Sequence, residues 1–128
     1  MANPLQAYQR MRVMTASPNE LILMLYEGLI RFARNAEAAL EAEDPKALGY
    51  NLKRALDILA HLQDSLAPSV SPTIVASLDR TYEYWSNALV KSQVSGDLEL
   101  LRKVITQFEE MFEAWKIAAA ETAAQART

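Results

Sequence analysis

The sequence contains no cysteine and a single histidine. The absence of cysteine excludes disulfide frameworks, thiolate metal sites and cysteine nucleophiles. One histidine cannot supply the two Glu-x-x-His pairs that a di-iron site in a helical bundle requires. We therefore predict no metal site, and we interpret His61 as a structural or solvated residue, placed on a helix to pair with Asp57 four residues earlier.

Other signatures of an enzyme are also missing. There is no glycine-rich phosphate loop, and Ser65, Ser69 and Ser71 have no histidine and acid near them in a recognisable motif. The acidic runs at 41–44 and 109–110 are typical of solvated helix ends and outer faces. We predict a protein that is not an enzyme and that needs no cofactor.

Long apolar runs and clustered charge are lacking too. The longest unbroken apolar run, Leu21 to Tyr26, is far shorter than the roughly 20 residues of a membrane span, and the first residues do not resemble a secretion signal. Thirteen Lys and Arg against sixteen Asp and Glu give a net charge of −3, with the basic residues scattered. We expect a soluble cytoplasmic protein without membrane insertion and without a nucleic-acid partner.

Strong helix-start signals divide the chain at four places. Ser17-Pro18-Asn19-Glu20 combines a capping serine, a proline at the first helical position and a glutamate that completes a capping box. Asp44-Pro45 and Ser71-Pro72 repeat the cap-then-proline order, and Gly96-Asp97 is a break followed by a capping carboxylate. These signals predict four helices that start near Pro18, Pro45, Pro72 and Leu98.

Each predicted helix carries an apolar seam with steps of three and four residues. The four seams are Ile22, Leu25, Leu29, Phe32, Ala36, Ala39; Leu48, Leu52, Ala55, Leu59, Leu62, Leu66; Val75, Leu78, Tyr82, Trp85, Leu89; and Leu98, Leu101, Ile105, Phe108, Phe112, Trp115, Ala119. Short joints make neighbouring helices antiparallel. The sequence predicts one all-α domain, an antiparallel up-and-down four-helix bundle over 17–118, with an extra N-terminal segment at 1–16 and a frayed tail at 119–128.

Two of the predicted helices carry further apolar residues outside these seams. A second row on the first helix holds Leu23, Tyr26, Ile30 and Ala33, and one on the last helix holds Leu100, Val104, Met111 and Ala118. Such rows can widen the core stripe at the helix junctions. They can also line a groove that accepts an amphipathic segment of another protein.

Several short motifs, in order, resemble those of a known family. The first group of motifs contains Asn3-Pro4, Ala7-Tyr8, Thr15-Ala16-Ser17-Pro18, Glu20-Leu21 and Met24-Leu25-Tyr26. The second group, further along the chain, contains Leu78, Tyr82-Glu83-Tyr84, Leu89 and Ala114-Trp115-Lys116. This order resembles the flagellar export chaperone FliS over almost the whole chain. Leu5, Asn87-Ala88 and Ser92-Gln93 depart from the family pattern, which leaves the fold and the general role intact.

The resemblance implies a function that the seams alone do not give. It implies binding of the C-terminal helical region of flagellin in the cytoplasm before export, and presentation of flagellin to a flagellar export gate component. It also makes the segment around Leu5 and Tyr8 a candidate for a displaceable lid, although Tyr8 can equally cap the core. The predicted partner-binding residues are Leu5, Tyr8, Leu23, Tyr26, Ile30, Tyr84, Val104 and Met111.

The same residues also allow a function of a different class. The chain can be a structural or regulatory bundle whose extra apolar rows are buried in a homodimer. A tight dimer that is indifferent to flagellin would favour this alternative.

Overall fold

Four long helices make up the computed structural model, which describes residues 18–66 and 71–126. In the order of the chain they are α2 (Pro18–Glu41), α3 (Pro45–Asp64), α4 (Pro72–Ser95) and α5 (Leu98–Ala126). Each helix begins at the residue that the sequence predicts, because the start signals are local. No strand occurs within the described residues.

The helix ends show which capping groups act. Asp44 caps α3, since its Oδ1 accepts a hydrogen bond from the Ala47 amide at 3.2 Å. Asp97 Oδ1 accepts from the Leu100 amide at 3.0 Å at the start of α5, and Gly96 ends α4 in the left-handed region with φ of 67°. Ser71 stands at the N-cap of α4 without a side-chain capping bond, so the predicted capping role of its hydroxyl is wrong.

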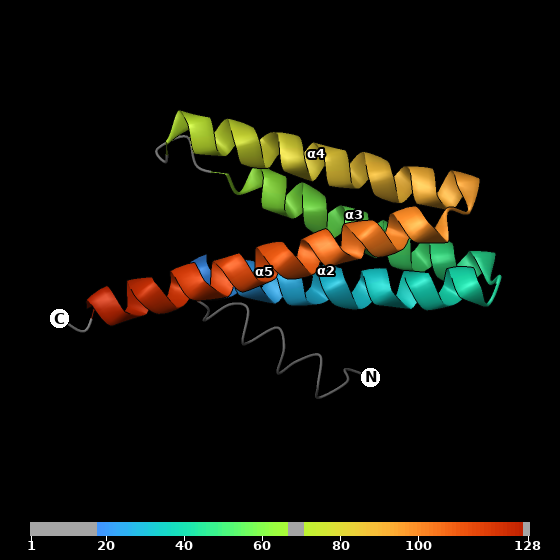
Figure 1. Ribbon diagram of the computed structural model, residues 1–128, viewed down its shortest axis with the longest axis horizontal. Helices are drawn as coiled ribbons and strands as arrows, with labels where there is room; N and C mark the ends of the chain where they lie inside the picture. The colour runs from blue at the N-terminus through green and yellow to red at the C-terminus, as the bar shows by residue number, and fades with distance from the viewer. Residues whose placement is uncertain (1–17, 67–70, 127–128) are drawn as a thin grey trace, which may run out of the picture.

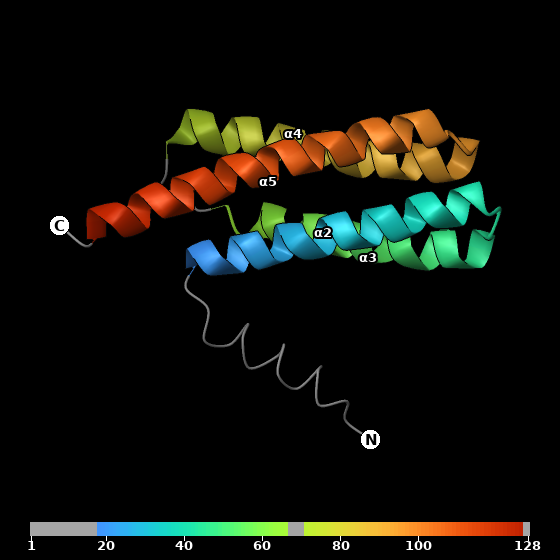
Figure 2. The ribbon, with the colours of Figure 1, turned by 60° about the horizontal axis from the view of Figure 1, so that its bottom comes forward.

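The helices run alternately up and down (Figures 1 and 2). α2 packs against α3 and α5, and α4 packs against the same two helices, so that α2 and α4 face each other across the bundle. The predicted antiparallel four-helix bundle is therefore confirmed. α5 continues to Ala126 instead of fraying after residue 118, which agrees with the high helix propensity of its alanine-rich end.

The predicted seams form the shared core. The second seam is buried from Leu48 to Leu62, and most of the positions in the other three are buried or half-buried. Residue size changes along this core. Its aromatic end contains Tyr26, Tyr82, Trp85, Phe108 and Phe112; its alanine end, near the α2–α3 and α4–α5 turns, contains Ala36, Ala39, Ala88 and Ser92.

Candidate functional site

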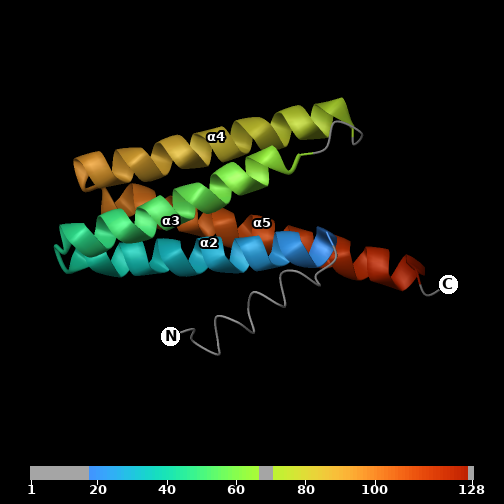
Figure 3. The ribbon, with the colours of Figure 1, turned by 180° about the vertical axis from the view of Figure 1, so that it is seen from behind.

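The packing of α4 against α5 changes along their length. The two helices meet at the turn of Gly96 and Asp97 and separate toward the other end of the bundle (Figures 1 and 3). Large rings lie between the helices on that side: Trp85 contacts Phe108 edge-to-face at a centroid distance of 4.9 Å and Tyr82 at 5.7 Å. Side chains of this size keep the helix axes further apart than the small side chains of Ala88 and Ser92, which α4 carries toward the opposite end.

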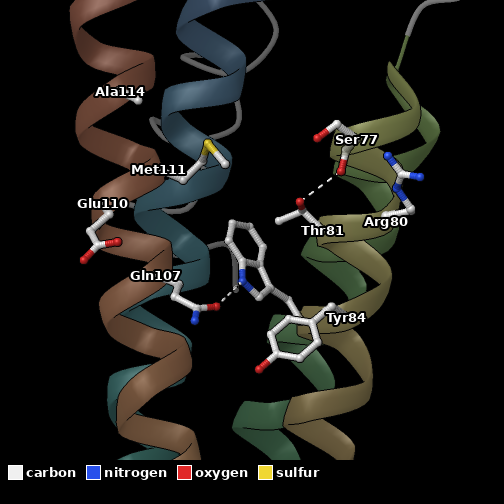
Figure 4. A pocket seen from close by; sticks show the side chains of 9 residues that line it. Ser77, Arg80, Thr81, Tyr84, Gln107, Glu110, Met111 and Ala114 are labelled. Carbon is white, nitrogen blue, oxygen red and sulfur yellow. Dashed lines mark hydrogen bonds between the residues drawn. The ribbon is translucent and has the colours of Figure 1, made fainter. Parts of the chain in front are cut away.

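The separation leaves an open groove of about 580 Å³, here called the α4–α5 groove. Figure 4 shows side chains of α4 along one wall and of α5 along the other. The lining residues are Ser77, Arg80, Thr81, Tyr84, Trp85, Gln107, Glu110, Met111 and Ala114. From Ser77 to Trp85 the α4 wall extends about 12 Å, or about two helical turns. That length suits two or three apolar anchors of a bound helix.

One side-chain hydrogen bond joins the two walls. Trp85 Nε1 donates to Gln107 Oε1 at 2.9 Å. Because an indole nitrogen only donates, the carboxamide oxygen of Gln107 must face Trp85, and the amide nitrogen turns away with its two N–H donors. In the hydrogen bonds found among the described residues, this nitrogen has no acceptor, so the groove offers hydrogen-bond donors beside an apolar floor.

A buried pair of hydroxyl groups supports the aromatic end. The hydroxyls of Tyr26 and Tyr82 lie 3.0 Å apart, joining the helices that face each other across the bundle. Burial raises the pKa of Tyr26 far above its usual range, and the neighbouring Tyr82 raises it further. Burial also raises the pKa of Tyr82. Both groups therefore stay neutral over the physiological range.

Trp115 lies beside this pair. Its indole N–H is close enough to lower the pKa of Tyr26, which opposes the larger effect of burial. Nevertheless, its buried Nε1 forms no hydrogen bond of normal geometry with the described residues. We conclude that the approach to Tyr26 is too long or too poorly aligned to satisfy this donor fully.

A second, smaller groove lies on the other side of α5, between α5 and α2. This α2–α5 groove encloses about 470 Å³, with Ile30 and Phe112 as its apolar lining and Glu109, Glu113 and Lys116 around them. Ion pairs cross or border it: Arg34 binds Glu109 at 2.7 Å, and Lys116 binds Glu113 at 2.6 Å. Glu110 borders both grooves, so α5 is a ridge between two apolar depressions.

The structure brings some predicted partner-binding residues together and buries others. Tyr84, 48% exposed, and the half-buried Met111 line opposite walls of the α4–α5 groove, and Ile30 lines the α2–α5 groove. Leu23 is half-buried on α2 and lines neither groove. Leu5 and Tyr8 lie outside the described residues, so the lid stays a prediction.

Tyr26 and Val104 are fully buried core residues. Of the two roles left open for the second rows, the wider core stripe holds for Tyr26, Val104 and Ala33, and their burial does not support the prediction of Tyr26 and Val104 as partner-binding residues. A helix with two packing neighbours buries a stripe wider than a single seam. In this conformation none of the three side chains offers surface to a partner.

Sequence reasoning missed Gln107, Ser77 and Ala114 as groove residues. Trp85 was assigned to the core alone, and the structure places it in the core and at the groove floor. No local signal identifies Gln107, because its partner Trp85 is 22 residues away on another helix.

The described residues also lack the features of two other functional classes, metal proteins and proteins that span a membrane by helices. They contain no group of three or more His, Cys, Asp or Glu side chains placed to hold a metal ion. No described helix is both long enough and apolar enough to cross a membrane. His61 is exposed and lies with Asp57 and Arg54 in a shallow depression between α2 and α3.

Comparison with known proteins gives the family. The family model described as "Flagellar protein FliS" matches residues 1–122. The chain belongs to the FliS family. Among curated relatives of this FliS-family chain, the flagellar secretion chaperone FliS of Bacillus subtilis (strain 168) is 35% identical over 114 residues, which cover 89% of this chain and 84% of that protein.

Further similarities agree with this membership. The flagellar secretion chaperone FliSB of Pseudomonas aeruginosa is 30% identical over 104 residues, covering 81% of this chain and 82% of that protein. A solved structure described as a flagellar chaperone from bacteria superposes with a TM-score of 0.76 at 20% identity, covering 93% of this chain and 99% of that one. At that identity the superposition shows a shared fold.

Proposed function

We propose that this protein is a cytoplasmic chaperone that binds the C-terminal helical region of flagellin in the α4–α5 groove. Binding covers the apolar face of flagellin, prevents premature polymerisation and assists delivery to the flagellar type III export apparatus through an export gate component. Membership of the FliS family, whose relatives are named flagellar secretion chaperones, supports the role.

The groove itself carries the assignment of the site. Tyr84 is almost half exposed although it stands next to Trp85, which is only 2% exposed. An exposed aromatic ring beside a methionine on the facing wall is typical of a surface that accepts an amphipathic helix. Tyrosine is also among the residues that most often dominate binding energies at interfaces.

The α2–α5 groove extends the same surface. A segment that crosses the α5 ridge reaches Ile30 and Phe112 after leaving Tyr84 and Met111. Coupled folding and binding of a disordered segment typically buries about 1,000–3,000 Å², more than one two-turn groove provides. We therefore include both grooves in the proposed binding surface, with the α4–α5 groove as its centre.

Calorimetric titration with a flagellin C-terminal segment, followed by circular dichroism of the mixture, tests the proposal. We expect saturable one-to-one binding, a negative heat-capacity change and a gain of helix. Absence of heat and of added helix at high micromolar concentrations would contradict flagellin binding. A tight homodimer that ignores the segment would favour the structural alternative.

Tyr84→Ala identifies the site within the same experiment. We expect the dissociation constant to rise by about tenfold or more, with little change in stability because the side chain is exposed. Tyr50→Ala is the matched control, since Tyr50 is 56% exposed on α3 and lines neither groove. Equal effects of the two substitutions would place the binding site elsewhere.

A further inference from the structure

The rims of the α4–α5 groove carry one charged residue each, and the two charges have opposite sign. Arg80 stands on the α4 rim and Glu110 on the α5 rim, both exposed, and no other charged residue lines this groove. Neither forms an ion pair within the described part of the chain. Figure 4 shows Arg80 on the side of α4 away from α5 and Glu110 on the side of α5 away from α4, so each side chain must turn toward the groove to meet a bound segment.

The two charges also lie at similar heights along the groove. The Trp85–Gln107 hydrogen bond marks one level on both helices. Arg80 precedes Trp85 by five residues and Glu110 follows Gln107 by three, which places them about 7.5 Å and about 4.5 Å beyond that level. Because the helices are antiparallel, both displacements point toward the open end. A helix in the groove therefore passes between them within a single turn.

We propose that this pair of rim charges selects the charge pattern of the bound helix and fixes its direction. The inference rests on the proposed function. The occupant carries an acidic residue on the flank that meets Arg80 and a basic residue on the flank that meets Glu110, with its apolar stripe on Trp85 and Met111. Reversing the direction of such a helix would place each charge beside a like charge, which is unfavourable.

The required order of charges follows from the handedness of the helix. In Figure 4 the reader looks into the groove with α4 descending on the right and α5 ascending on the left. A right-handed helix that runs parallel to α5 passes from its right flank, through the floor, to its left flank over about two residues. An acidic residue two positions before a basic one, with an apolar floor residue between them, therefore specifies a helix parallel to α5. The opposite order specifies a helix parallel to α4.

Charge reversal at the rims tests the proposal with a flagellin C-terminal segment as the probe. Arg80→Glu and Glu110→Arg should each raise the dissociation constant about three- to tenfold at low salt. The double variant, which keeps the net charge of −3, is again complementary to a segment bound in the reverse direction, so it should bind at least as tightly as the single variants. Both losses should shrink toward 1 M salt, where exposed charges are screened.

A matched control tests whether charge reversal weakens binding only at the rims of the groove or anywhere on the surface. Lys53→Glu combined with Glu27→Lys reverses two exposed charges that line neither groove and also keeps the net charge. We expect this variant to bind as the wild type does. If the Arg80 and Glu110 single variants act in opposite directions, or if their double variant binds more weakly than both single variants, the inference is wrong while flagellin binding stands. If the wild type does not bind the segment, both proposals fail.

The absence of cysteine allows direct detection of the direction. A nitroxide attached to a Thr73→Cys variant lies at the start of α4, which is the open end of the groove. A segment that binds parallel to α5 should show relaxation enhancement at its C-terminal half, and one that binds parallel to α4 at its N-terminal half. The half that is affected should follow the order of charges in the segment, and it should change in the double reversal variant. The same half affected in both proteins would contradict the inference.

Discussion

The two ends of the bundle solve the same packing problem with side chains of different size. At the alanine end, Ala36 and Ala39 of α2 and Ala88 of α4 are buried, and the α4–α5 pair closes on a turn of two residues. At the aromatic end, Tyr26, Tyr82, Trp85 and Phe112 fill the core, and α4 and α5 separate. On α4 the large ring of Trp85 lies toward the open end and the small side chain of Ala88 lies toward the closed end, which agrees with the place where the surface opens into a groove.

The aromatic end also contains polar groups, because tyrosine carries a hydroxyl and tryptophan an indole N–H into the core. The Tyr26–Tyr82 pair is satisfied within the core, and Trp85 is satisfied by Gln107 at the groove. Buried polar groups without partners are costly. The position of Gln107 beside the groove thus follows from the need of Trp85 for an acceptor, and the same contact leaves amide donors for a partner.

Removing the ring of Trp85 should have the largest effect. Trp85→Ala deletes a side chain that is only 2% exposed and contacts two aromatic rings of the core in addition to Tyr26. We expect the free energy of unfolding to fall by about 3–5 kcal/mol, measured by urea denaturation. Tyr84→Ala is the neighbouring control and should change it by less than about 0.5 kcal/mol. Similar losses for both variants would contradict the assignment of one residue to the core and the other to the surface.

Adding volume at the alanine end should have the next largest effect. Ala36→Leu places a larger side chain where the native one has no exposed surface, and we expect a loss of about 1–3 kcal/mol from overpacking. Ala114→Leu is the matched change in the α4–α5 groove, where the alanine is exposed. It should leave stability nearly unchanged and weaken flagellin binding. Equal stability of the two variants would contradict the claim that the alanine end is tightly packed whereas the groove has room for a larger side chain.

High pH should destabilise the aromatic end. Tyr26 and Tyr82 have pKa values raised by burial above the value of about 10 in unfolded chains. The unfolded state therefore loses these protons first, and stability, complete below about pH 10, should fall by up to about 1.4 kcal/mol per pH unit for each tyrosine.

Tyr26→Phe separates this effect from general alkaline denaturation. The variant should lose about 1–3 kcal/mol at neutral pH, because the Tyr82 hydroxyl loses its partner. Its stability should then decline less steeply above about pH 10. Thermal unfolding at a series of pH values measures both effects. An unchanged slope would mean that Tyr26 does not contribute to the alkaline loss.

The ion pairs between α2 and α5 should have the smallest effect. Arg34 and Glu109 are 52% and 44% exposed, so Arg34→Gln should lower stability by only about 0.2–1 kcal/mol at low salt. The difference from the wild type should vanish in concentrated salt, where exposed charges are screened. A loss that persists in salt would show that Arg34 acts through packing of its stem.

Local signals in the sequence were sufficient for the helix starts and for most of the core. Capping residues and prolines act within one turn, and the seam periodicity reports which face is buried. Two features depended on tertiary context. The depth of the buried stripe on α2, which includes Tyr26, depends on how many helices surround it. The groove depends on the sizes of side chains that meet across helices, such as Trp85 and Phe108.

One turn also lacked its usual signal. Glu43, between α2 and α3, adopts a positive φ of 54°, a conformation that glycine and asparagine prefer. The short connection between Glu41 and Pro45 imposes this geometry on Glu43, although a glutamate does not by itself predict a positive φ. Sequence patterns predicted a joint at this place, and only the structure gives its backbone conformation.

Methyl NMR of the methionines tests most directly whether the α4–α5 groove receives flagellin. Met111 lines that groove, whereas Met24, on α2, lines neither groove. In a protein labelled at its methionine methyl groups, with Met111 assigned by Met111→Leu, saturation with a flagellin C-terminal segment should shift the Met111 signal strongly and leave Met24 nearly unchanged. A bound complex in which Met24 shifts and Met111 does not would contradict the account.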